Sequence, residues 1–248
     1  MRMTFSEREV EKALKFELER QEFTILDKDE KEQYSTRFKV YLNKRLPTHT
    51  SSFEEFWRKA NFDPRDIPPP QPEIDMILVD NRNMWHAIEL KAIKKKHRRI
   101  LPSYYFGLGQ TLAYLSFGFD EVAIWQCFDA STLSDEEIFK YNDAFTRIRL
   151  PLRRFVGTTY FKITATEKGK LGIQTARSPD NDRSWQNGIG ISLPTGKQGI
   201  RCVSCNPLLR KVEPQEGIFQ FDDNNAQRVN TVRKFLEIQK AKLWDKSN

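Results

Sequence analysis

The sequence has few of the residues on which several common kinds of functional site depend. It contains only three cysteines, Cys127, Cys202 and Cys205, which cannot form a disulfide framework and are one ligand short of a four-cysteine metal site. The three histidines show no mutual spacing typical of a site. A P-loop, an HExxH helix, a GxSxG turn and a dinucleotide-binding glycine motif are also absent. The corresponding enzyme classes therefore have no support in the sequence.

Long apolar runs are scarce as well. The first residues, MRMTFSEREVEK, lack the apolar core of a signal peptide. Residues 100–119 form an uncharged stretch of twenty, but they include a proline, three glycines, three tyrosines and a glutamine, which is too polar for a good membrane span. We therefore expect a cytoplasmic protein without a membrane segment.

Basic residues, in contrast, are abundant and unevenly placed. The 41 Lys and Arg residues outnumber the 34 Asp and Glu residues, which gives a net charge of +7. Residues 91–99, KAIKKKHRR, hold six basic side chains and no acid, and residues 145–177 hold eight against a single glutamate. Each run alone could be a solvated surface. Together they favour a polyanionic partner, with nucleic acid ahead of an acidic membrane.

Hydrophobic periodicity predicts an α/β protein. Helices are expected at residues 6–22 with Ser6 as N-cap, at 30–45, at 52–60, from Pro102 to about 117, at 134–147 and at 225–244. Strands are expected at residues 23–26, 74–79, 86–93 and 120–128, and a hairpin at 159–176. The order strand, strand, helix, strand indicates a sheet with helices packed on it. Residues 151–248 are either a small second domain or an elaboration of the first.

The hairpin at 74–93 carries charge among residues suited to a core. Asp75 lies in its first strand, and Glu89 and Lys91 share one face of its second strand. Two carboxylates on neighbouring strands can bind Mg²⁺, with the carbonyl of Leu90 as an additional ligand. A lysine on the same face can orient a water or stabilise the charge that develops on a phosphate. The alternative is an edge hairpin with a surface salt bridge.

A helical segment after the hairpin adds a second motif. Gln110 and Tyr114 are four residues apart and share a helical face. With Pro72, the arrangement P…D…(D/E)-x-K followed by Q-x-x-x-Y resembles the PD-(D/E)XK nuclease superfamily, and within it the RecB-like group. The resemblance covers roughly residues 6–130.

This resemblance implies a fold, a cofactor and residue roles. It implies a restriction-endonuclease-like core, a central mixed sheet flanked by helices, within residues 1–150. Residues 151–248 would form a β-rich extension ending in a helix. It also implies a Mg²⁺- or Mn²⁺-dependent deoxyribonuclease in which Asp75 and Glu89 bind the metal and Lys91 is catalytic. Gln110 and Tyr114 would contact DNA or brace the site.

Two further groups of residues complete the expected site. Members of the superfamily commonly carry one more acid on the first helix; the candidates are Glu7, Glu9, Glu11 and Glu17, of which we favour Glu11 beside the apolar stripe. The basic run should line the DNA path with Lys94, Lys95, Lys96, Arg98 and Arg99. The competing interpretation is a DNA-binding or scaffolding protein with this fold that does not cleave. The sequence leaves open whether the protein forms a homodimer.

Overall fold

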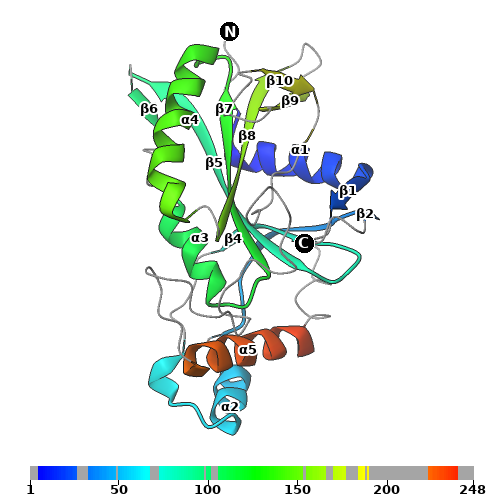
Figure 1. Cartoon of the computed structure of the whole chain (residues 1–248), viewed down its shortest axis with the longest axis vertical. Coiled ribbons are helices and arrows are strands. Elements are labelled where there is room, and N and C mark those ends of the chain that lie inside the picture. Colours follow the sequence, from blue (N-terminus) through cyan, green and yellow to red (C-terminus); the bar gives the residue numbers. More distant parts are fainter. Residues whose placement is uncertain are drawn as a thin grey trace.

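The computed structural model shows an α/β protein with a mixed sheet flanked by helices (Figure 1). The structure describes residues 5–26, 33–48, 50–67, 73–97, 99–101, 106–152, 155–165, 170–176, 184–187, 189 and 223–239. Within these ranges, no helix is long and apolar enough to cross a membrane. Pro72, Arg98, Cys202 and Cys205 lie outside the described residues.

The main sheet has eight strands in the order β10-β9-β8-β7-β5-β4-β3, with β6 paired to β5. Its centre is parallel, because β5 (Trp85–Lys96), β7 (Glu121–Asp129) and β8 (Val156–Ala165) run in one direction. The flanking strands are antiparallel: β3 (Lys39–Lys44), β4 (Ile74–Val79), β6 (Arg99–Leu101), β9 (Leu171–Ala176) and β10 (Trp185–Asn187). The predicted hairpin strands are therefore found, and the second is longer than expected.

Helices cover both faces of this sheet, as Figure 1 shows. On one face, α3 (Leu108–Leu115) and α4 (Asp135–Arg149) are the crossovers that connect the parallel strands, as such connections require. On the other face, α1 (Glu7–Arg20) buries its apolar stripe of Val10, Leu14 and Leu18. Ser6 caps α1 through a reciprocal hydrogen-bond pair with Glu9, the capping box.

The prediction of a helix over residues 30–45 was wrong. This segment forms β2 (Gln33–Thr36), which pairs with β1 (Phe23–Leu26), and then β3. The buried residues Thr36, Phe38 and Val40 alternate with the exposed Arg37 and Lys39, which is a strand pattern. Val40 also pairs with Leu78 of β4, so a contact distant in sequence fixes the strand.

The C-terminal part of the chain returns to the core. After the 3-10 turn η2 (Leu150–Leu152), strands β8 to β10 extend the main sheet. The helix α5 (Asp223–Ile238) packs against α2 (Ser51–Lys59), with the ring of Phe235 edge-on to the ring of Phe53. The short 3-10 turn η1 (Pro64–Asp66) follows α2. Figure 1 shows these two helices together at one end of the molecule.

Arg233 fastens α5 to the β4–β5 hairpin. Its guanidinium lies 3.7 Å from the Trp85 ring centroid, donates to the carbonyl of Gly118 at 2.9 Å and pairs with Asp120 at 3.2 Å. Gly118 has a φ of 76°, and a Cβ there would lie 2.8 Å from the Cβ of Arg233. Only glycine therefore allows α5 to approach so closely.

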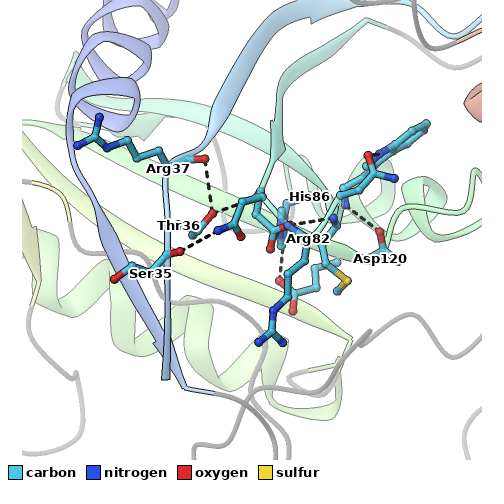
Figure 2. Close-up of polar contacts among 12 residues, drawn as sticks. Ser35, Thr36, Arg37, Arg82, His86 and Asp120 are labelled. Carbon is cyan, nitrogen blue, oxygen red and sulfur yellow. Dashed lines mark hydrogen bonds and ion pairs between the residues drawn. The ribbon is translucent and has the colours of Figure 1, made fainter. Parts of the chain in front are cut away.

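A partly buried polar network holds the turn of this hairpin and links it to β2 (Figure 2). The backbone N–H of Asn81 donates to the Thr36 hydroxyl at 3.1 Å, and Asp80 accepts from the backbone of Arg82 at 2.9 Å. His86 is fully buried and lies 2.8 Å from a carboxylate oxygen of Glu121. Sequence analysis did not foresee the contact between His86 and Glu121, because these two residues come together only through the pairing of β5 with β7.

Replacing Arg233 should loosen the attachment of α5. Arg233→Ala removes the cation from the Trp85 ring and a partner from the largely buried Asp120, so it should lower the free energy of unfolding by about 2 kcal/mol. Urea unfolding measures this change. Lys234→Ala, on the exposed face of the same helix, is the control and should cost little. Equal stabilities of the two variants would contradict the proposed role of Arg233.

Candidate active site

The candidate site lies where β4 and β5 separate. The two strands are paired from Val79, which lies opposite Trp85, to Met76, which lies opposite Ile88. On the same strand, β5 pairs with β6 only from Lys94 onward. Between these points, two backbone amides of β5 are satisfied by carboxylates. The N–H of Leu90 donates to Asp75 at 2.7 Å, and the N–H of Ala92 donates to Glu7 of α1 at 3.2 Å. The gap in the sheet is therefore filled with acidic side chains.

Three carboxylates converge at this gap. Glu7, Glu11 and Asp75 each offer an oxygen, and these oxygens all lie within 4.8 Å of one another. Glu7 and Glu11 are four residues apart, so both project from one face of α1 toward the start of β4. Asn43, whose φ of 52° is left-handed, donates its side-chain amide to Glu11 at 2.9 Å. Hard oxygen donors at this spacing suit Mg²⁺ or Mn²⁺.

The environment disfavours negative charge on two of these groups. Burial raises the pKa of Asp75 to about 7, and the charges of Glu89 and Glu7 act in the same direction, against the Leu90 N–H and Lys91. Burial also raises the pKa of Glu11, opposed by the hydrogen bond from Asn43. A cation among them would relieve this repulsion.

Lys91 connects this cluster to Glu89. Its ammonium nitrogen lies 2.6 Å from Glu89 and 3.8 Å from Asp75. Burial alone would lower the pKa of Lys91, but its bond to Glu89 and the charges of Glu89, Asp75 and Glu7 outweigh burial and raise it. Lys91 is therefore an ammonium ion at neutral pH. It can donate hydrogen bonds and stabilise anions, and it is not poised to accept a proton.

Glu89 is held deeper in the protein than the other acids. Only 1% of its surface is exposed, and the hydroxyl of Tyr114 donates to it. Burial, followed by the charge of Glu89, raises the pKa of Tyr114, which therefore stays neutral. The Tyr114 side chain is fully buried, and its hydroxyl contacts Glu89; which of the two roles implied by the resemblance it has stays a prediction. Gln110 is half-buried one turn earlier on α3.

Gly107 fits the start of α3 against these charged side chains. It is the N-cap of the helix with a φ of 87°, a conformation that favours glycine. A Cβ at this position would lie 2.9 Å from Cε of Lys91 and 3.2 Å from Cγ of Glu89. The backbone of the helix entry therefore packs directly on the ion pair and limits how it can move.

The basic residues of the run 91–99 differ in their surroundings: one forms an ion pair with a neighbouring helix, and others are exposed. Lys95 pairs with Glu137 of α4, so it is not a free phosphate contact in this structure. Lys94, Lys96 and Arg99 are exposed on the hairpin formed by β5 and β6. Arg98, the fifth expected DNA contact, lies outside the described residues.

Sequence reasoning did not select two members of the candidate site. Glu7 was one of four candidates on the first helix, but Glu11 was preferred; the structure places both at Asp75. Their spacing of four residues was the available signal. Asn43 carried no signal, because its place depends on a left-handed backbone at the end of β3. Glu89, which was expected to share a metal with Asp75, accepts a hydrogen bond from Tyr114 and pairs with Lys91, and its metal-binding role stays a prediction.

Neutralising Asp75 should change how stability depends on pH. The pKa of Asp75 is about 7 in the folded protein and about 4 in the unfolded chain, so folding takes up a proton between these values. This contribution to stability is lost as the pH rises from about 4 to about 7. Asp75→Asn keeps an acceptor for the Leu90 N–H and removes the charge. In EDTA, the wild type should therefore lose more stability between about pH 5 and about pH 8 than Asp75→Asn.

Urea unfolding at both pH values measures this difference, and Glu22→Gln, at an exposed position, is the control. Parallel pH profiles of stability for the wild type and Asp75→Asn would show that the surroundings of Asp75 do not raise its pKa.

In comparisons with known proteins, no family model, no curated protein and no solved structure gives a significant match to this chain.

Proposed function

We propose that the protein is a metal-dependent DNA nuclease that hydrolyses phosphodiester bonds at the gap between β4 and β5. One observation carries the proposal. A buried lysine ammonium lies between Glu89 and Asp75, beside a group of three carboxylate oxygens within 4.8 Å of one another. A structural ion pair has no need of so many acids, whose mutual repulsion destabilises the fold.

The residues present fit a divalent cation. Asp75, Glu7 and Glu11 would hold Mg²⁺ or Mn²⁺. The N–H of Leu90 donates a hydrogen bond to Asp75, and the carbonyl of a strand residue points to the same edge as its N–H, so the Leu90 carbonyl would be available as a further ligand. When bound, the cation would lower the pKa of a coordinated water and neutralise charge on the phosphate. The proposal keeps Glu89 as a residue of the site, acting through Lys91.

Lys91 supplies the positive charge that phosphate hydrolysis requires. A water oxygen forms a bond to phosphorus while one ester P–O bond breaks, and negative charge grows on the phosphoryl oxygens. The ammonium of Lys91 can donate to these oxygens or to the attacking water. Glu89 and Tyr114 fix its position, so little reorganisation is needed during the reaction.

The charge of the surface agrees with a DNA substrate. The net charge is +7, and Lys94, Lys96 and Arg99 are exposed on the strand that leaves the site and on its partner β6. Basic side chains near a metal site attract the phosphate backbone and position it without reading the sequence.

Lys91 is tested by replacement with an apolar side chain of similar length. Lys91→Met should lower turnover on DNA with Mg²⁺ or Mn²⁺ by about two to three orders of magnitude, because one stabilising charge is lost. Single-turnover cleavage of circular and linear DNA measures this effect. Lys140→Met, on the exposed face of α4, should cleave normally. Full activity of Lys91→Met would refute the assignment.

The metal site is tested without an activity assay. Mn²⁺ should raise the melting temperature of the wild type, since an ion bound only to the folded state stabilises it by about 3 kcal/mol at one hundred times its dissociation constant. Glu7→Gln and Glu11→Gln should each weaken this effect, whereas Glu22→Gln should keep it. Metal binding by the wild type without cleavage of any DNA would favour the non-cleaving, DNA-binding alternative.

A further inference from the structure

One aromatic side chain next to the candidate site is not explained by packing. Phe106 precedes α3 and keeps 57% of its surface exposed. The ammonium nitrogen of Lys91 lies 5.4 Å from its ring centroid. An exposed phenylalanine by itself is ordinary. Its contact with the lysine of the site sets Phe106 apart.

The backbone holds this ring in place. Gly107, the next residue, packs against Lys91, Glu89 and Ile124, and its φ of 87° sets the direction in which the chain enters α3. The backbone that carries Phe106 is therefore fixed directly beside the Lys91–Glu89 pair. The surface is also open at the exposed Gly109, three residues further along, where a Cβ would meet no atom within 4 Å.

We infer that Phe106 is a stacking platform for an unpaired nucleobase next to the scissile phosphate. The inference rests on the proposed nuclease function and specifies its substrate: DNA with an unpaired nucleotide at the cleavage point, as in single strands, flaps and frayed ends. A phosphate at Lys91 brings the adjoining base near the ring. Aromatic rings stack on any base whose face is free, but in an intact duplex both faces are already stacked.

A second exposed phenylalanine among the described residues, Phe16, differs from Phe106 in its surroundings. Phe16 on α1 is 58% exposed, and Arg20 of the same helix covers it at 4.8 Å. It matches Phe106 in residue type and exposure and contacts a cation as well. The cation that it contacts belongs to its own helix surface, whereas that of Phe106 belongs to the site. Phe16→Ala is therefore a matched control.

The test compares binding of single-stranded and blunt duplex oligonucleotides that carry 2-aminopurine and phosphorothioate linkages, which resist hydrolysis, in the presence of Mg²⁺. The wild type should quench 2-aminopurine fluorescence in the single strand. Phe106→Ala should weaken single-strand binding by about tenfold or more and remove the quenching, with little effect on duplex binding. Phe106→Trp should restore both signals, and Phe16→Ala should behave as the wild type.

Two results would overturn the inference: single-strand binding that does not depend on Phe106, or an equal loss for single strands and duplex. Its failure is distinct from failure of the nuclease proposal. Cleavage that persists unchanged in Phe106→Ala would refute the stacking platform alone. Absence of cleavage of any DNA, with single-strand binding that still requires Phe106, would refute the nuclease and support the platform.

Discussion

The separation of β4 from β5 is the constraint on which the candidate site depends. A strand in the middle of a sheet must satisfy its backbone amides, and an unpaired buried amide costs about 1–3 kcal/mol. Where β4 departs, Asp75 and Glu7 take over this task for Leu90 and Ala92. The same carboxylates thereby gather around one point with Glu11. Backbone satisfaction and the crowding of negative charge are thus two results of one structural feature.

The surrounding fold holds this feature fixed from both faces of the sheet. On one face of the sheet, α1 delivers Glu7 and Glu11 as part of a helix whose apolar stripe is fully buried. On the other face, α3 brings Tyr114 to Glu89, and Gly107 at its start packs on Lys91. The charges are therefore placed by packing and hydrogen bonds of the folded chain. Such preorganisation is what electrostatic stabilisation of a transition state requires.

Local signals predicted much of the fold, and long-range pairing limited the rest. The alternation of Ile74–Val79 and the serine that caps α4 were sufficient to place β4 and α4. The segment 30–45 was mistaken for helix, although Phe38 and Val40 alternate with charged residues, because the strands β2 and β3 within it are defined by partners elsewhere in the chain. The charged residues Asp75, Glu89 and Lys91 could be named from spacing. That Glu89 faces Lys91 and Tyr114 while Glu7 joins Asp75 depends on how α1 and α3 pack, which spacing does not encode.

The most direct test of the central claim is the location of a bound ion. Anomalous diffraction from crystals soaked in Mn²⁺ would place the metal without reference to catalysis. The account predicts one strong peak at the gap between β4 and β5, about 2.2 Å from a carboxylate oxygen of Asp75 and within reach of Glu7 and Glu11. A site without a peak at saturating Mn²⁺, with Lys91 still paired to Glu89, would contradict it. The carboxylates would then serve only to satisfy the backbone of β5.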